Sequence, residues 1–427
     1  MPTINKAHIK RNSEDKSFKT TSNEHASSST NNEILNEVIK HQYALKSFAR
    51  TIENYEDLIE LDTKQYNLDS LFAMDIGGSL CKIIFFECKS ENFENTELKE
   101  LFKSLKNNIF STEDYGFSGI RDRYKSIKTK TGCIHFILFE TQRVKNAVEL
   151  LFQNDIIKNI KQISCTGGGS YKFEEYFREH YNIEIKKYDE FKSLLTGLNA
   201  LLKYSPNESY HYNIDKTIND FDKPIPDVYD NSKSIFPYLL VNVGSGVSVL
   251  HVKDENNFER VSGSGIGGAT FSGLVNALTN INSFDEALQA SRKGNSANVN
   301  MLVGDIYGGE YQSFNLPANM VASFFGKFSK NDSLDKASDA DICNALLVMI
   351  TNNVGQVAYL NAMRYNLTKI YFSGNFLRSN VVAMKALANA IHFWSHGEIQ
   401  AHFLKHEGYF GALGTFFLNN LSQYNNI

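Results

Sequence analysis

Two short glycine turns with matching surroundings are the features of this 427-residue sequence best suited to chemistry. The first is Met74-Asp75-Ile76-Gly77-Gly78-Ser79, and the second is Val241-Asn242-Val243-Gly244-Ser245-Gly246. Because glycine has no Cβ, backbone N–H groups in such turns can approach a ligand closely, and successive N–H groups that face one way bind anions such as phosphate. Each turn lies between two apolar segments typical of strands. The repeat therefore predicts a duplicated α/β unit with one phosphate-binding hairpin in each half.

The residues that follow the first turn favour a phosphoryl-transfer site. Cys81-Lys82-Ile83-Ile84-Phe85-Phe86 is typical of a strand, whereas the Walker A phosphate loop requires G-x-x-x-x-G-K-[ST] at the start of a helix, a string that this sequence lacks. Asp75 could hold a hydrated Mg²⁺, and the charge of Lys82 could stabilise a transferring phosphoryl group. Taken alone, a single turn of this kind favours an ordinary hairpin, whereas the repeated pair together with the other glycine turns favours a phosphate site.

A G-x-G-x-x-G string at Gly263–Gly268 raises two alternatives. It follows a predicted strand and precedes a predicted helix, and Asp285 or Glu286 lies near the distance expected for the ribose-binding acid of a dinucleotide-binding oxidoreductase. Residues 238–252, however, are typical of a β-hairpin rather than of the βαβ unit that such an oxidoreductase needs. The string therefore favours a loop and a helix N-terminus that receive phosphates.

Two other segments could contribute to such a site, although neither is decisive alone. Ser373-Gly374-Asn375 follows a predicted strand and could close over a base or ribose, but a helix cap explains it equally well. Phosphoryl transfer to an alcohol needs a carboxylate that accepts the hydroxyl proton. Asp189-Glu190, between a predicted strand and helix, could face a cleft, but acids are also favoured at any helix start.

His402 and His406 have i, i+4 spacing without the acid of an HExxH motif, so the histidines predict no metal grouping.

Composition excludes several classes of function. The net charge of −4 gives no global field for nucleic acid or an anionic membrane. No apolar run approaches the roughly 18–20 residues that span a bilayer, and the first residues lack the apolar stretch of a signal peptide. The five cysteines are dispersed and form no CxxC pair, which argues against a disulfide framework or a zinc site. This usage indicates a reducing compartment, and we expect a cytoplasmic protein.

The same patterns predict the organisation of the chain. Residues 1–33 are polar and poor in large apolar side chains, which predicts a disordered tail, and residues 34–68 have the periodicity of an amphipathic helical extension. An N-terminal lobe is expected over 69–235, and its end, at about 204–235, is a proline-rich surface insertion. A C-terminal lobe is expected over 236–427. We expect strands at 71–76, 82–87, 134–139, 163–165, 183–188, 238–243, 247–252 and 369–372, and helices at 143–154, 171–180 and 341–364 and after Gly408.

From 71 to 418, about four-fifths of the chain, these motifs resemble those of the eukaryotic-type (type II) pantothenate kinases, members of the actin/hexokinase-like superfamily. The resemblance is carried by MDIGGSLCK (74–82), YGFSGIRD (115–122), IHFILFETQ (134–142), CTGGGSYKFE (165–174), YDEF (188–191), LLVNVGSGVSVL (239–250), ERVSGSGIGGATF (259–271), GDIYGG (304–309), TNNVG (351–355), SGNFLR (373–378) and HEGYFGALG (406–414). Their number and order make the match specific. It implies an α/β fold of duplicated actin-like ATPase (RNase H-like) domains with a nucleotide cleft between them.

The resemblance also implies an activity and its partners. Such a kinase transfers the γ-phosphate of ATP, with Mg²⁺, to the 4′-hydroxyl of pantothenate, the first step of coenzyme A biosynthesis. It implies a homodimer or a heterodimer with a paralogue, and feedback inhibition by CoA or acyl-CoA. Two alternatives stay open: a non-catalytic CoA-sensing or scaffold paralogue of the same fold, and a kinase for another small alcohol.

The resemblance assigns roles to residues at matching positions. Glu190 matches the general base, Trp394 matches a tryptophan near the acyl-thioester pocket, and Asp75 would hold Mg²⁺ through water. The substrate-binding positions are Ser245, Ser248 and Arg260. Together with the turn after the strand at 369–372, the expected nucleotide-binding set is Asp75, Gly77, Gly78, Ser79, Lys82, Gly267, Gly268, Ala269, Thr270, Phe271, Gly374 and Asn375.

Three positions depart from the family pattern. Ser79 stands where the family usually has threonine, so a hydroxyl is retained. Ser373 replaces an apolar residue. Ala269 replaces a glycine of the usual Gly-Gly-Gly-Thr turn, and its Cβ requires a negative φ or some strain, which could weaken the nucleotide contact.

Overall fold

The computed structural model describes residues 71–88, 114–115, 119–121, 126–128, 132–153, 157, 160–205, 208–214, 224–227, 234–329, 337–378 and 380–421. All of them belong to the second of two compact units, Tyr55–Ile427; the first unit is Met1–Asn54. The expected tail at 1–33 and the helical extension at 34–68 therefore lie outside the described residues.

The first sheet is built around the hairpin that carries Asp75 and Lys82. Its strands have the order β3-β4-β6-β2-β1-β7-β8, with β5 added on β6. The β1–β2 and β2–β6 pairs are antiparallel, and the β1–β7 and β7–β8 pairs are parallel. The strands are β1 (Phe72–Ile76), β2 (Leu80–Cys88), β3 (Asp114–Tyr115), β4 (Gly119–Arg121), β5 (Ile127–Lys128), β6 (Gly132–Glu140), β7 (Gln162–Thr166) and β8 (Glu184–Lys187).

The second sheet is built in the same way around the second hairpin. Its order is β10-β9-β17-β16-β11-β12-β13, with β11–β12 and β12–β13 antiparallel and β11–β16 and β16–β17 parallel. The strands are β9 (Ser209–Tyr212), β10 (Pro224–Pro226), β11 (Tyr238–Val243), β12 (Val247–Val252), β13 (Phe258–Ser264), β16 (Lys369–Ser373) and β17 (Gln400–Leu404).

The two sheets share one topology. In each, an antiparallel series of three strands is followed by two parallel strands on the other side of the first strand: β6-β2-β1-β7-β8 matches β13-β12-β11-β16-β17. This repeat confirms the prediction of a duplicated α/β fold. It also places the two glycine turns, between β1 and β2 and between β11 and β12, at equivalent positions.

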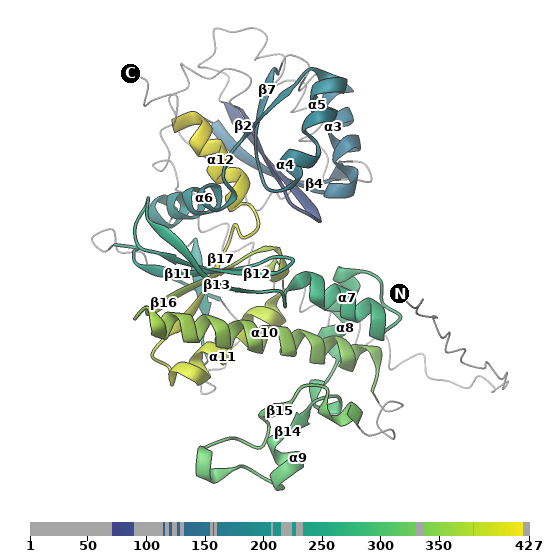
Figure 1. Ribbon diagram of the computed structural model, residues 1–427, viewed down its shortest axis with the longest axis vertical. Coiled ribbons are helices and arrows are strands. Elements are labelled where there is room, and N and C mark those ends of the chain that lie inside the picture. The colour runs from purple at the N-terminus through teal and green to yellow at the C-terminus, as the bar shows by residue number, and fades with distance from the viewer. Residues whose placement is uncertain are drawn as a thin grey trace, which may run out of the picture. The chain divides into compact units, whose positions relative to one another are not determined.

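Helices cover both sheets (Figure 1). With the first sheet lie α3 (Val144–Gln153), α4 (Gly169–Lys172), α5 (Glu174–Tyr181), α6 (Glu190–Tyr204) and α12 (Phe410–Leu421). With the second lie α7 (Gly268–Leu278), α8 (Phe284–Lys293), α10 (Asp339–Arg364) and α11 (Val381–Ser395). The segment between α8 and α10 contains β14 (Met301–Leu302), α9 (Val303–Tyr307) and β15 (Val321–Ser323). In the described part of the chain, no helix combines the length and the apolar character needed to cross a membrane.

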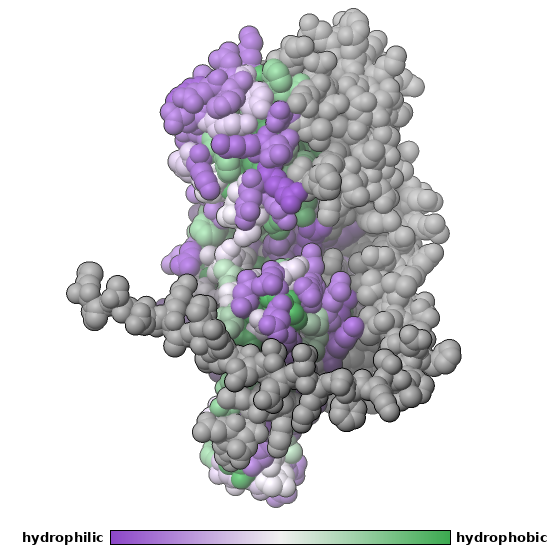
Figure 2. All heavy atoms as spheres, turned by 90° about the vertical axis from the view of Figure 1, so that its right-hand side faces the viewer, coloured by the Kyte–Doolittle hydropathy of each residue, from purple (hydrophilic) through white to green (hydrophobic). Residues whose placement is uncertain are grey.

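The fold has two hydrophobic cores, and the first, which contains the buried residues of the first sheet, also includes Leu240 of β11 and Leu250 of β12 in the second sheet. The first core includes Phe85, Phe136 and Phe416, and the second includes Phe271, Phe372 and Phe403. Figure 2 looks onto the side on which α3 and α5 lie, and hydrophilic side chains predominate among the residues that it colours there, as expected for helices with one buried face. The cores thus hold the two hairpins while the outer helix faces meet solvent.

Two segments cross between the halves. Residues 204–235, which the sequence assigns to the end of the N-terminal lobe, supply β9 and β10 to the second sheet, where Tyr210 and Tyr212 are buried. The C-terminal helix α12 packs in the first core beside α6 (Figure 1). A Cβ on Gly414 of α12 would collide with the backbone of Ser193 in α6, so glycine permits this close crossing. The segment between β17 and α12 is therefore joined to the second half at β17 and to the first half at α12.

Candidate functional site

Asp75 and Lys82 form the centre of the candidate site. They are directly opposite in the β1–β2 ladder, and Lys82 Nζ lies 3.3 Å from Asp75 Oδ2. Side chains opposite each other in antiparallel strands point to the same face. Both are largely shielded from solvent, with side-chain exposures of 13% for Lys82 and 17% for Asp75. The structure thus brings together the two charged residues that the sequence assigned to magnesium and phosphate.

Two glycines from distant segments lie against the Asp75 carboxylate. Gly167 follows β7 with a φ of +81°, and a Cβ built there would lie 2.8 Å from Asp75 Oδ1. A Cβ on Gly411, in the first turn of α12, would lie 2.9 Å from Oδ2. Any other residue would crowd the carboxylate, so both glycines keep its oxygens accessible. Sequence reasoning assigns neither glycine to the site; a parallel strand that ends beside β1, as β7 does, is the signal that could have placed Gly167 here.

The first glycine turn is held by a residue that sequence reasoning missed. Thr141 follows β6, and its hydroxyl donates to the Gly77 carbonyl at 2.8 Å while its backbone N–H donates to the Ser79 carbonyl at 2.9 Å. Gly77 N–H donates to the Leu80 carbonyl at 3.0 Å. Gly78 and Ser79 remain exposed at the tip. The turn is therefore held by hydrogen bonds from Thr141, while its tip stays exposed to solvent.

Glu190 is electrostatically coupled to Asp75 and Lys82. It is the first residue of α6, and the preceding Asp189 caps the helix by accepting from Lys192 N–H at 2.8 Å. Partial burial raises the pKa of Glu190, the Asp75 carboxylate raises it further, Lys82 lowers it, and Asp189 adds a smaller upward effect. Glu190 is still exposed enough for a ligand to reach it. The three residues therefore belong to one electrostatic site, with Glu190 at its open side.

The second glycine turn is docked on the start of α7. Gly268 N–H donates to the Gly244 carbonyl at 2.8 Å, and Ala269 N–H donates to the Ser245 carbonyl at 3.0 Å. A Cβ on Gly267 would lie 2.7 Å from the Ser245 carbonyl oxygen, so glycine is needed at this contact. Two N–H groups that were expected to receive phosphates are thus bonded to the hairpin.

The other predicted residues at this helix start have structural contacts. Ala269 lies in the first turn of α7 and is not among the residues with positive φ, so its Cβ imposes no backbone strain. The Thr270 hydroxyl donates to the Gly265 carbonyl at 2.9 Å. Phe271 is buried and packs edge-on against Phe376.

The predicted substrate residues lie on the second hairpin and its neighbour. Arg260 Nε donates to Ser248 Oγ at 3.4 Å, because Arg260 on β13 and Ser248 on β12 occupy adjacent antiparallel strands. A Cβ on Gly263 would collide with the Arg260 guanidinium, so this glycine makes room for the arginine side chain. Ser245 is exposed at the tip of the turn.

The turn after β16 contains a buried acceptor. Gly374 has a φ of +110°, and a Cβ there would collide with the backbone of Val243 at the end of β11. Asn375 Oδ1 is buried and has no hydrogen-bond partner among the described residues. A buried acceptor that lacks a donor is costly unless a ligand or water completes it.

The segment between β17 and α12 touches both halves of the candidate site. A Cβ on Gly408 would lie 3.8 Å from Asn375 Oδ1, and Gly411 faces Asp75. The segment is anchored by Glu208, which accepts from the backbone N–H of His406 at 3.0 Å and lies 2.6 Å from its Nδ1. His406, which the sequence left without a role, is thus part of this anchor.

Trp394 lies apart from these contacts. It is half-buried near the end of α11, and its ring meets the exposed ring of Phe393 edge-on at 5.2 Å. Its assignment to an inhibitor pocket therefore rests on the sequence resemblance alone.

Comparison with known proteins identifies the family. The model of the Fumble family matches residues 71–418. This chain belongs to the Fumble family. A pantothenate kinase of Schizosaccharomyces pombe is 34% identical over 391 residues, which cover 89% of this chain and 90% of the yeast protein. The match thus spans both hairpins and the segment that joins them.

Two other relatives are longer than this chain. Pantothenate kinase 2 of Arabidopsis thaliana is 38% identical over 380 residues, and a 4′-phosphopantetheine phosphatase of Mus musculus is 38% identical over 348 residues. The chain spans 40% of the length of each of these two proteins. One of these relatives is named a kinase and the other a phosphatase at the same sequence identity. Identity alone therefore does not assign the reaction of this chain, and the residues of its site must do so.

Proposed function

We propose that this chain is a pantothenate kinase, which transfers the γ-phosphate of ATP to the 4′-hydroxyl of pantothenate. The observation that carries the proposal is the coupling of Glu190 to the Asp75–Lys82 pair beside the first glycine turn. A carboxylate, an ammonium and a second carboxylate next to a phosphate-binding turn are the groups that in-line phosphoryl transfer to an alcohol requires. Family membership supplies the substrate class.

Glu190 is the general base. Its raised pKa makes its carboxylate a stronger base than that of an ordinary glutamate, which suits a group that accepts the hydroxyl proton. Its position at the start of α6 fixes the backbone, because Asp189 caps that helix. The hydroxyl oxygen then attacks the γ-phosphorus, and Lys82 offsets negative charge on the transferring group.

The residues around Asp75 fit a hydrated Mg²⁺. Hard oxygen ligands suit this ion, which keeps most of its waters when a protein binds it. Lys82 contacts only one of the two carboxylate oxygens, and the glycines at 167 and 411 leave open the space that a Cβ would fill. When bound, Mg²⁺ would neutralise charge on the β- and γ-phosphates.

The second hairpin and its neighbours bind the rest of the two substrates. Arg260, oriented through Ser248, offers a planar set of donors to the pantothenate carboxylate, with Ser245 beside it. Asn375 Oδ1 accepts from a donor of the base or ribose, which completes its hydrogen bonding. The remaining nucleotide contacts are those of the glycine turn at 77–79, because the N–H groups of Gly268 and Ala269 at the start of α7 already donate to the second hairpin.

Further proposals follow from the resemblance. The enzyme acts in the cytoplasm as a homodimer or as a heterodimer with a paralogue, and CoA or an acyl-CoA inhibits it near Trp394. Light scattering of the purified chain measures its oligomeric state, and inhibition by CoA with and without Trp394→Ala tests the inhibitor site.

The test of the main proposal is a phosphorylation panel. The purified chain is incubated with ATP and Mg²⁺ and with pantothenate, N-acetylglucosamine or simple sugars, and products are identified by mass spectrometry. Phosphopantothenate alone is expected. A sugar phosphate instead would identify a kinase for another small alcohol, and CoA binding without any product would identify a non-catalytic sensor. Retention of Asp75, Lys82 and Glu190 in one site favours the active enzyme over the sensor.

A further inference from the structure

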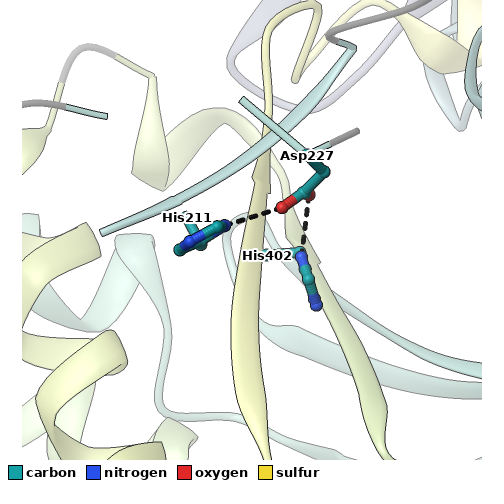
Figure 3. A group of neighbouring side chains, drawn as sticks. All are labelled: His211, Asp227 and His402. Carbon is teal, nitrogen blue, oxygen red and sulfur yellow. Dashed lines mark hydrogen bonds and ion pairs between the residues drawn. The ribbon is translucent and has the colours of Figure 1, made fainter. Parts of the chain in front are cut away.

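Three potential metal ligands converge where β10, β9 and β17 lie side by side in the second sheet (Figure 3). They are His211 on β9, Asp227 immediately after β10 and His402 on β17. His211 Nδ1 lies 2.7 Å from Asp227 Oδ1, and His402 Nδ1 lies 2.8 Å from Asp227 Oδ2. The sequence predicted no metal grouping, because it compared His402 only with the nearby His406. The structure corrects this by pairing His402 with residues far away along the chain.

Strand pairing explains the convergence. Phe403 of β17 pairs with Tyr210 of β9, which brings their neighbours His402 and His211 close together. The insertion then folds back, because Ile225 of β10 pairs with His211 on the other side of β9. The backbone N–H of Asp227 donates to the Ser209 carbonyl at 3.0 Å. All three ligands are thus positioned by sheet hydrogen bonds, which hold a site more rigidly than a free loop does.

The geometry and accessibility of the cluster suit a cation. Each oxygen of the Asp227 carboxylate lies within 2.8 Å of one histidine nitrogen, so both oxygens face the cluster. The three side chains keep 15–19% of their surface exposed, so an ion and its waters can reach them.

The donor set selects a class of ion. Two imidazole nitrogens and one carboxylate oxygen suit Zn²⁺ and other divalent transition ions, whereas Mg²⁺ and Ca²⁺ prefer oxygen ligands. Three protein ligands with one position left for water is a common zinc arrangement. The ligand atoms lie within 4.8 Å of one another, so only small side-chain shifts are needed to place all three around one ion.

We propose that His211, Asp227 and His402 form a binding site for a divalent transition ion of the zinc class. The ligands are Nδ1 of each histidine and an oxygen of Asp227, and water completes the coordination. The ion takes the place of the hydrogen bonds that now join the histidines to Asp227, and each neutral imidazole keeps its one proton on Nε2 while Nδ1 binds the ion. The ion would fasten the insertion to β17, the strand that continues into the segment beside Asn375 and Asp75.

Zinc titration of the tag-free full chain tests the site. Isothermal titration calorimetry is expected to show one Zn²⁺ per chain in a site that excess Mg²⁺ does not occupy. His211→Ala, His402→Ala and Asp227→Asn should each weaken binding by at least the roughly 10–100-fold loss seen when a partner that only orients a ligand is removed. The matched controls His180→Ala and Asp254→Asn alter exposed residues outside the cluster and should leave the affinity unchanged.

A spectroscopic readout keeps the proposal testable if a variant misfolds. Co²⁺ added to the wild-type chain should produce visible d–d absorption bands that one equivalent of Zn²⁺ abolishes, and anomalous scattering at the zinc edge should locate the ion between the three residues. Zinc affinity that is unchanged in all three folded variants, or an anomalous peak elsewhere, would overturn the proposal and leave the cluster as a hydrogen-bonded bridge. None of these readouts depends on kinase activity.

Discussion

Lys82 and Asp75 face each other across the first hairpin, with Nζ 3.3 Å from Oδ2, and both act on the pKa of Glu190. The pair therefore does more than join two strands. The lysine partly cancels the carboxylate that would otherwise push the pKa of Glu190 higher. It thus stabilises the ionised base and, in the proposed reaction, the charge on the transferring phosphate.

Lys82→Met should lower kcat and also move the pH profile. Loss of one preorganised charge at a transferring group typically costs about 10²–10³-fold in turnover. Since Lys82 lowers the pKa of Glu190, its removal should shift the acid limb of the kcat profile to higher pH. Lys253→Met breaks an exposed pair with Glu259 and serves as the control. If turnover falls but the acid limb does not move, Lys82 does not act through the pKa of Glu190.

Glu190→Gln should retain ATP and pantothenate binding and lose turnover by about 10²–10⁴-fold, as for removal of a general base. In the wild type, kcat should fall as the pH drops through the raised pKa of Glu190, because the protonated acid cannot accept a proton. The residual activity of the variant should lack this limb. Near-normal turnover in Glu190→Gln would rule out the assigned role.

The same substitution should not destabilise the fold at neutral pH. A carboxyl group whose pKa is raised in the folded state binds its proton more tightly there than in the unfolded chain, so protonation favours folding. The ionised form is the less favourable one in the native protein. Glu190→Gln should therefore have an unchanged or higher melting temperature at pH 7, measured by thermal unfolding. A clear drop would mean that Glu190 is needed for structure.

Local sequence patterns were sufficient to predict the hairpins. The predicted strands at 238–243 and 247–252 have the same bounds as β11 and β12, because an apolar run, a glycine turn and a second apolar run specify a hairpin locally. The pairing of Asp75 with Lys82 follows from the same short-range geometry. The start of α6 at Glu190 was likewise marked by the capping residue Asp189.

Long-range contacts could not be predicted in this way. His402 and Asp227 are 175 residues apart, and the contact of Gly411 with Asp75 depends on α12 crossing back to the first core. No local periodicity encodes which strands become neighbours in a sheet. The prolines of 204–235 predict a surface insertion but not its pairing: Pro224 and Pro226 lie on the edge strand β10, where a missing N–H is tolerated.

Gly167→Ala should distort the site, whereas Gly168→Ala should not. At Gly167 the φ of +81° disfavours any side chain, and the new Cβ would lie 2.8 Å from Asp75 Oδ1 and 2.7 Å from the Ile76 carbonyl oxygen. A residue forced into such a conformation costs about 1–3 kcal/mol. At Gly168 the φ is −60° and a Cβ would meet nothing within 4 Å. Thermal unfolding and the apparent affinity for MgATP should both change only in the first variant; equal effects would show that Asp75 is not the sensitive neighbour.

The Glu208–His406 pair should be important for both stability and nucleotide use. Their side chains are only 1% and 2% exposed, so removal of Glu208 takes an acceptor away from buried groups of His406, at a cost of about 1–3 kcal/mol for each group affected. Glu208→Ala should thus lower the melting temperature sharply, while Glu255→Ala, which breaks an exposed pair with Lys203, should change it little. Glu208→Gln can still accept from the His406 backbone N–H and should recover part of the loss. If the Glu208–His406 pair positions Gly408 and Gly411, the KM for ATP should rise in folded Glu208→Gln. An unchanged KM together with a lower melting temperature would show that the pair has only a structural role.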